Sequence, residues 1–145
     1  MEVYTIGFAK RTALDFFGAL RRAGIRRLVD VRLNNTSQLA GFTKRDDLPF
    51  LLHEICGAEY RHEPLLAPTQ DMLDTYKKRK GSWQDYERRF LELMAERKIE
   101  EQISPALFAV PTILLCSETT ADHCHRRLVC TYLQDAWGDL EAIHL

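Results

Sequence analysis

An alternation of short strands and amphipathic helices begins in the first residues of the chain, and it constrains the fold more than any other feature. Residues 3–6 are a β-branched and aromatic run that is typical of a buried strand. Residues 13–20 carry apolar side chains at helical spacing, after Thr12 as a candidate N-cap and before Gly24 as a stop signal. Residues 27–31 form a second predicted strand. A strand, a helix and a strand in this order form a βαβ unit, which makes the two strands parallel.

The rest of the chain continues this alternation. Further strands are predicted at residues 59–62, 112–116 and 140–144, and the polar residues 33–45 are expected to form a surface loop. We therefore predict an α/β fold with three layers, in which a mostly parallel sheet is flanked by helices. No internal repeat, low-complexity tract or long linker divides the sequence, so residues 1–145 are expected to form a single domain.

Capping residues indicate where the later helices begin and end. Asp46 is expected to cap a helix that Gly57 closes, and Gly81 is expected to separate two further helices. Asp122 is expected to cap the last helix, which runs through Asp135. The helix after Gly81 carries an apolar stripe, which we interpret as a face turned toward the core: Trp83, Tyr86, Phe90, Leu93 and Met94.

The composition excludes several classes of protein. The chain is 46% hydrophobic and 28% charged, which argues against disorder, and its net charge of −1 argues against a generally basic, nucleic-acid-coating surface. A local basic patch for nucleic acid remains compatible with these numbers. We find no secretory leader and no apolar run of membrane-spanning length, and we predict a cytoplasmic protein without a membrane partner. The four cysteines lack the dense spacing of a disulfide scaffold, so we expect free thiols at Cys56, Cys116, Cys124 and Cys130.

Polar residues follow several of the predicted strands at the point where each strand ends. Asp30 lies within the second strand, and Arg32 and Asn34 come after it. Cys116 and Glu118 stand at the end of the fourth strand and just beyond it. Because ligands of parallel α/β sheets bind at the carboxyl ends of the strands, we expect these side chains to surround one crevice.

The segment ILLCSETTADHCHRRLVC, residues 113–130, adds charged groups to this crevice. A helix that starts near Asp122 places Cys124, His125 and Arg126 in its first turn. The helix dipole attracts anions to such a terminus and disfavours cations. Arg126 therefore needs compensation, either from a protein carboxylate or from a bound anion. The second reading makes Arg32, Arg126 and Asn34 candidate anion-binding residues, and both readings stay open.

Cys116 is the candidate nucleophile. A thiol at a strand end, facing a helix N-terminus and arginines, is expected to have a lowered pKa. The loop after it does not match the phosphate cradle of cysteine phosphatases, which needs arginine six residues later, where this chain has Asp122. A rhodanese-type sulfur-transfer loop would use backbone amides around the thiol, but SETTAD contains no glycine. The alternative is that Cys116 only packs at the end of a core strand.

Two further chemistries use the same residues. Glu118 and Asp30 could form a carboxylate pair for acid–base or glycosidic chemistry, unless Asp30 makes a structural ion pair with Arg32 or Arg126. Cys116, Cys124 and His125 could instead bind zinc, with Glu118 or His123 as a fourth ligand. The Cys-x7-Cys-His spacing is not a standard zinc pattern, and the sequence indicates no particular cofactor.

Four motifs together resemble a known family. YTIG at residues 4–7, LVDVR at 28–32, and LLCSE and HCHRRL at 114–118 and 123–128 resemble, in order and spacing, the family named domain of unknown function 488 (DUF488). LNNTSQLAGF at 33–42 is similar to one of its subgroups. The resemblance implies an intracellular α/β domain, mostly prokaryotic, with no established reaction. The residues that match the family pattern are Asp30, Arg32, Cys116, Glu118, Cys124, His125 and Arg126.

One position departs from the family pattern. Members often carry His-Ser after YTIG, whereas this chain has Phe8 and Ala9. A step that uses this His or Ser in other members is therefore missing here or depends on another residue.

These observations lead to one functional hypothesis and two alternatives. The leading hypothesis is a small enzyme, a hydrolase or transferase, that uses Glu118, Cys116 or both on an anionic substrate such as a nucleotide or nucleic-acid fragment. His125 would assist as a reactive group, and Asp30 would orient Glu118. The alternatives are a non-catalytic module that recognises an anion or phosphate, and a Cys/His metal-binding protein. The sequence does not indicate an oligomeric state.

Overall fold

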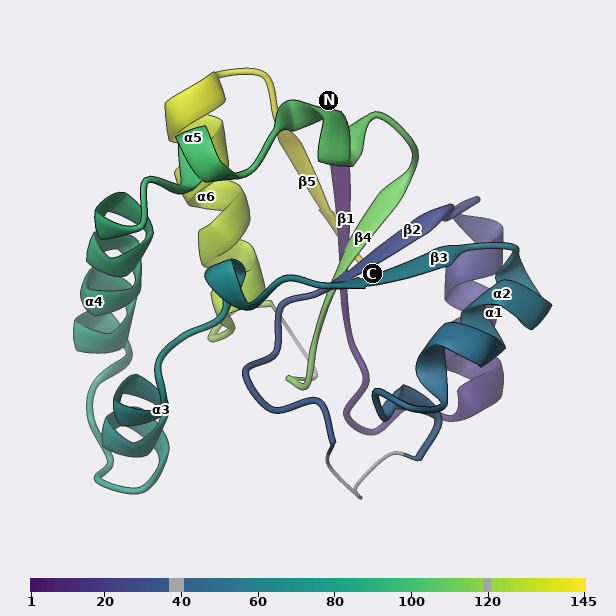
Figure 1. Cartoon of the computed structure of the whole chain (residues 1–145). Coiled ribbons are helices and arrows are strands. Elements are labelled where there is room, and N and C mark those ends of the chain that lie inside the picture. Colours follow the sequence, from purple (N-terminus) through teal and green to yellow (C-terminus); the bar gives the residue numbers. More distant parts are fainter. Residues whose placement is uncertain (37–40, 119–120) are drawn as a thin grey trace.

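Five parallel strands form the sheet at the centre of the computed structural model (Figure 1). The structure describes residues 1–36, 41–118 and 121–145. The strand order is β3-β2-β4-β1-β5, and every neighbouring pair is parallel. The strands are β1 (Glu2–Gly7), β2 (Arg27–Asp30), β3 (Glu59–His62), β4 (Thr112–Cys116) and β5 (Glu141–His144).

Helices cover both faces of this sheet, which confirms the predicted three-layer α/β fold. On one face lie α1 (Ala13–Arg22) and α2 (Leu48–Cys56). The other face is covered by α3 (Gln70–Lys77), α4 (Trp83–Glu96), the short α5 (Ile99–Gln102) and α6 (His125–Trp137). Among the described residues, no helix combines the length and the hydrophobicity that a membrane span requires.

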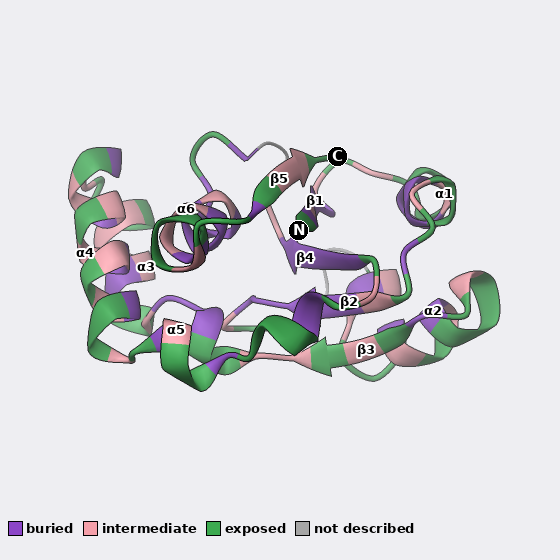
Figure 2. Cartoon of the chain, turned by 90° about the horizontal axis from the view of Figure 1, so that it is seen from above, coloured by how far each residue is buried: buried purple, intermediate pink, exposed green. Residues whose placement is uncertain are grey.

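The sheet divides the core into two clusters because successive side chains of a strand point to opposite faces. Leu114 and Cys116 of β4 belong to the cluster under α4 and α6, whereas Ile113 and Leu115 belong to the cluster under α1 and α2. Strand β4 is buried along its whole length, and the edge strands β3 and β5 are only partly buried (Figure 2). A side chain at the end of β4 is thus presented from a strand that is buried along its whole length.

Side-chain caps fix several helix starts as the sequence predicts. The Thr12 hydroxyl accepts a hydrogen bond from the Asp15 amide at 3.0 Å, and the Ser82 hydroxyl accepts one from the Asp85 amide at 3.1 Å. A free backbone N–H in the first turn is satisfied in each case. Gly57, in the left-handed region with φ of 62°, closes α2 as expected.

Two predicted helix starts are wrong. The residue before α2 is Asp47 rather than Asp46, and its side chain makes no capping bond. The last helix begins at His125, because the Cys124 amide bonds to the Ala121 carbonyl in a turn and Cys124 itself is extended. Asp122 therefore lies in that turn and not at the cap. Of the predicted loop at residues 33–45, positions 37–40 lie outside the described residues, while Gly41–Thr43 form a short 3-10 helix.

Candidate functional site

The carboxyl end of β4 is the point where the chain connections diverge. After β1 and β2 the chain passes to α1 and α2 on one face of the sheet, but after β4 it passes to α6 on the other face. Because β4 lies between β2 and β1, loops that leave in opposite directions open a crevice above it. This is where the sequence predicts the site.

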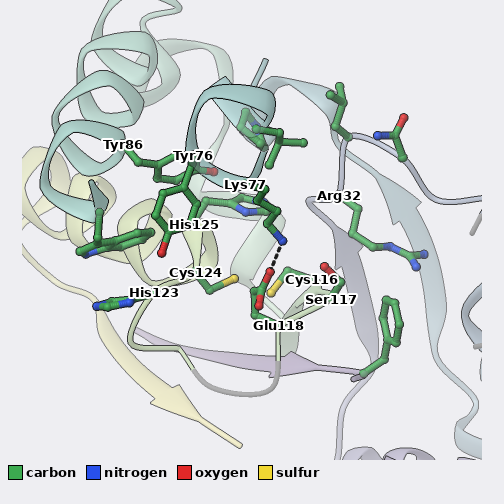
Figure 3. Close-up of a pocket in the computed structure, with 16 residues that line it drawn as sticks. Arg32, Tyr76, Lys77, Tyr86, Cys116, Ser117, Glu118, His123, Cys124 and His125 are labelled. Carbon is green, nitrogen blue, oxygen red and sulfur yellow. Dashed lines mark hydrogen bonds and ion pairs between the residues drawn. The ribbon is translucent and has the colours of Figure 1, made fainter. Parts of the chain in front are cut away.

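A cavity of about 210 Å³ occupies this crevice (Figure 3). Residues that follow β1, β2 and β4 form its base, and residues from α3, α4 and the start of α6 form its walls. It is lined by Phe8, Arg32, Leu33, Asn34, Pro68, Leu73, Tyr76, Lys77, Trp83, Tyr86, Cys116, Ser117, Glu118, His123, Cys124 and His125. Of the eight predicted site residues, the structure brings Arg32, Asn34, Cys116, Glu118, Cys124 and His125 to this cavity.

Three hydrogen-bond donors converge on the sulfur of Cys116. Arg126 Nη1 lies 3.1 Å from it, and the Cys124 thiol and the Glu118 backbone amide also donate to it. Burial alone would raise the pKa of Cys116, but these donors and the positive charge of Arg126 bring that pKa below the ordinary thiol value. This direction agrees with the lowered pKa that the sequence predicts.

Arg126 is held in place by the backbone around it. Its side chain is only 1% exposed, and Nη1 also donates to the Glu118 carbonyl at 2.9 Å. Gly7 pairs in register with Cys116, and a Cβ atom on Gly7 would lie 1.4 Å from the Glu118 oxygen and 2.4 Å from Arg126 Nη1. The absence of a side chain at position 7 therefore makes room for the guanidinium beneath Cys116.

Glu118 lies at the rim of the cavity and pairs with a cation that the sequence did not single out. Lys77, at the end of α3, forms an ion pair with the Glu118 carboxylate, and the two side chains are 51% and 40% exposed. In the view of Figure 3 the carboxylate lies between the Lys77 amine and the Cys116 sulfur. Ion pairs this exposed contribute at most about 1 kcal/mol, so Glu118 can change partners at little cost.

The His125 ring is neutral, and one of its nitrogens makes a hydrogen bond that holds the fold together. Its Nε2 lies 2.7 Å from the Val31 carbonyl, and because a carbonyl only accepts, Nε2 carries the proton. Burial lowers the pKa of His125 to about 4. This bond ties the first turn of α6 to the residue that follows β2.

Aromatic side chains form one wall of the cavity. Trp83 stacks on Tyr86 with ring centroids 5.3 Å apart, and His123 stacks on Trp83 at 4.9 Å. Tyr76 meets Tyr86 at 5.2 Å. The sequence predicts Trp83 and Tyr86 only as core residues; they are buried, as predicted, but their rings also face the cavity. Helical periodicity reports burial and cannot separate these two roles.

Asp30 and Arg32 form a buried ion pair with each other. Arg32 Nε and Nη2 each donate to one Asp30 oxygen at 2.8 Å, and Tyr60 donates to Asp30 at 2.7 Å. Asp30 shares the face of Leu28, which lies under α1 and α2, whereas Cys116 points to the other face. Among the described residues, Asp30 thus bonds to Arg32 and Tyr60 rather than to Glu118.

The predicted anion-binding residues are mostly engaged within the protein. In Figure 3 the Arg32 side chain turns away from Cys116. Its guanidinium donates to Asp30, and Nη2 also donates to the Thr43 carbonyl at 2.6 Å. Arg126 is bound to Cys116, and the Asn34 amide lies 3.4 Å from Gln70 at the surface. Anion binding by these three residues stays a prediction, and Lys77 is the exposed cation of the cavity rim.

Comparison with known families shows the family to which this chain belongs. The family described as domain of unknown function DUF488 matches residues 12–133. This chain belongs to the DUF488 family. The matched region contains the β2 and β4 ends and the start of α6, and it leaves out β1 and β5. Neither the curated proteins nor the solved structures contain a match.

Phe8 follows β1 and lies at the cavity of this DUF488 chain. The Phe8 ring lines the cavity and lies 5.4 Å below the Arg32 guanidinium, a distance typical of a cation–π contact. Position 8 therefore presents an apolar ring to the cavity.

The zinc alternative lacks a supporting cluster. Within residues 1–36, 41–118 and 121–145, no group of three or more His, Cys, Asp or Glu side chains has the arrangement of a metal site. Cys116 and Cys124 do meet, but His125 is committed to Val31 through Nε2. Within the described residues, the Cys116 and Cys124 thiols thus pair with each other, and Cys116 also contacts Arg126.

Proposed function

We propose that this DUF488 protein is a hydrolase or transferase whose nucleophile is the thiolate of Cys116. The observation that supports the proposal is the convergence of three donors on one sulfur at the base of a cavity: the Arg126 guanidinium, the Cys124 thiol and the Glu118 amide. A packing cysteine needs none of them. Cys130 is buried in the same core but has no comparable set of donors. Burial raises the pKa of Cys130 to about 12.

The walls of the cavity suggest the class of substrate. The wall that includes Tyr76, Trp83 and Tyr86 is aromatic, and the proposal places a planar, apolar part of the substrate against it. An anionic group fits near Lys77, the half-exposed cation of the rim. Both features occur together in nucleotides and other aromatic phosphates, which is the anionic class that the sequence also favours.

Substrate binding would rearrange the rim. Cys116 has no water-accessible surface while Glu118 pairs with Lys77. An incoming anion competes for Lys77, releases the Glu118 carboxylate and opens the path to the sulfur. The thiolate then forms a bond to the electrophilic centre, and the leaving group departs with the electrons of the broken bond. Glu118 activates the water or acceptor that removes the group from Cys116.

Alkylation rates test the thiolate directly. Iodoacetamide should modify Cys116 with an apparent pKa below the ordinary value of about 8.5, and peptide mapping should show Cys130 unmodified in the folded protein. Modification of Cys116 only at or above the ordinary pKa, or not at all without denaturant, would refute the proposal.

Charge at the rim is tested with a matched pair of reagents. Iodoacetate carries a negative charge and iodoacetamide does not. The iodoacetate rate at Cys116 divided by the iodoacetamide rate therefore measures how strongly the rim attracts an anion. Lys77→Met should lower this ratio, whereas Lys78→Met, which removes the neighbouring lysine outside the cavity, should leave it unchanged. If Lys77→Met has the same ratio as Lys78→Met, the proposal that the substrate is anionic is refuted.

Turnover is tested with p-nitrophenyl phosphate, which joins a planar ring to an anion. Wild-type protein should release nitrophenolate in a burst stoichiometric with the chain, as expected for a covalent intermediate. Cys116→Ser should show no burst, and Glu118→Gln should keep the burst and slow the steady phase. Equal release by wild type and Cys116→Ser would count against nucleophilic catalysis.

A further inference from the structure

A second thiol shares the cavity with Cys116. Cys124 is the residue before α6, it is 2% exposed, and its side chain lines the same cavity. Its thiol hydrogen-bonds to the Cys116 sulfur, and Figure 3 shows the two side chains directed toward each other. Both cysteines are free thiols. Two thiols in contact inside a pocket form a more specific arrangement than either cysteine alone.

Packing does not account for this pair. Cys130 lies on α6 six residues after Cys124 and is equally buried, but it does not line the cavity. Apolar packing at Cys124 could be served by alanine or valine. Only a thiol at this position can both donate to the Cys116 sulfur and later bond to it.

The surroundings give the two thiols different pKa values. The hydrogen bond to Cys116, together with burial, raises the pKa of Cys124 far above the ordinary value. The Arg126 guanidinium contacts Cys116, 3.1 Å from Nη1. The pKa of Cys116 is therefore the lower of the two, and Cys116 is the better attacking thiol. Thiol–disulfide exchange requires this division between an attacking and a resolving cysteine.

We propose that Cys116 and Cys124 form a redox-active dithiol that exchanges with small disulfides carrying an anionic group. The inference rests on the proposed function in one respect, namely that Cys116 is the nucleophile. The anionic group of the disulfide would meet Lys77 at the rim, and the disulfide would lie across the cavity floor.

The exchange balances in two steps. The Cys116 thiolate attacks one sulfur of the disulfide RSSR, the S–S bond breaks, and RS⁻ leaves with the electron pair and takes a proton from water. Cys124 then gives up its proton to water and attacks the Cys116 sulfur of the mixed disulfide, which releases the second RS⁻; this thiolate takes up a proton in turn. The protein dithiol is oxidised to a Cys116–Cys124 disulfide, and RSSR is reduced to two RSH.

Glutathione disulfide is the probe for the experiment, because it is small and carries carboxylates. The folded protein is incubated with increasing ratios of glutathione disulfide to glutathione, and thiols, intact mass and peptide maps are measured. Wild type should lose two of its four thiols, become lighter by two hydrogen atoms and yield a peptide that links Cys116 to Cys124. Cys130→Ala, the matched variant on the same helix, should behave as wild type.

Removal of the resolving thiol separates the inference from the proposed function. Cys124→Ser and Cys124→Ala should each accumulate a glutathione adduct on Cys116, about tenfold above the amount in wild type. If wild type itself accumulates that adduct while Cys124 stays reduced, the dithiol is overturned and the Cys116 nucleophile survives. If Cys116 reacts neither with glutathione disulfide nor with iodoacetamide, both proposals are overturned.

Discussion

Nη1 of Arg126 lies 3.1 Å from the sulfur of Cys116 and 2.9 Å from the carbonyl of Glu118. One guanidinium nitrogen thus joins the first turn of α6 to the end of β4 and to the residue that carries the candidate acid–base group. Because Arg126 is almost fully buried, its charge is poorly screened by water and acts mainly on its neighbours. The same contact therefore contributes to the fold and to the state of the thiol.

Replacement of Arg126 by lysine should raise the pKa of Cys116, so that less of the thiolate is present at neutral pH. Lysine keeps the positive charge but loses the planar group that serves two acceptors at once. We expect the apparent pKa of Cys116 to rise by about one unit, and its alkylation rate near neutral pH to fall about tenfold. The pH dependence of iodoacetamide modification measures this. Arg22→Lys, an exposed control on α1, should change nothing, and an unshifted profile in Arg126→Lys would show that the guanidinium is dispensable.

A methyl group on Gly7 should displace Arg126 or Glu118. The added Cβ would lie 1.4 Å from the Glu118 carbonyl oxygen, a backbone atom that cannot move aside alone. We expect Gly7→Ala to lower the free energy of unfolding by about 3 kcal/mol or more. Urea denaturation followed by circular dichroism measures this change. Gly41→Ala adds a methyl group where no atom lies within 4 Å, so it should leave the stability nearly unchanged.

Replacement of Asp30 should lower the stability of the fold and leave the reactivity of Cys116 unchanged. Asp30→Asn leaves the buried Arg32 charge without its carboxylate, which typically costs about 3–5 kcal/mol. The folded variant should still show the wild-type alkylation profile at Cys116, since the two side chains lie on opposite faces of the sheet. The double variant Asp30→Asn/Arg32→Met should recover part of the loss. A raised Cys116 pKa in the stable double variant would instead place Asp30 in the site.

Protonation of His125 should destabilise the folded protein in mild acid. Its pKa is about 4 when folded and close to 6.5 when unfolded, so between these values the unfolded chain binds the extra proton. The stabilisation is complete above pH 6.5 and disappears as the pH falls toward 4, by about 3 kcal/mol in total. His125→Gln should remove this part of the pH dependence of the free energy of unfolding. His53→Gln, at an exposed position, should retain the wild-type slope.

Some of the fold follows from the sequence with residue-level accuracy. The strands at 59–62 and 112–116 have the predicted limits. Turn signals bound both segments, Gly57 before the first and Pro111 before the second. The sequence predicts the cap of the last helix two residues too early, at Asp122 instead of Cys124. A good capping residue, Asp122, was available, but the turn from Ala121 to Cys124 uses the backbone differently.

The sequence by itself determined the α/β layers, the strand edge at which the candidate site lies and the presence of Cys116, Glu118 and Arg126 near that edge, because periodicity and strand ends are local properties. Only the tertiary structure decided the partners. It paired Asp30 with Arg32 on one face and Cys116 with Cys124 and Arg126 on the other, and it brought Lys77 to Glu118 and the α4 aromatics to the cavity. These contacts depend on strand order and on the pleat that turns each side chain to one face, and residues distant in sequence meet only after the sheet has formed.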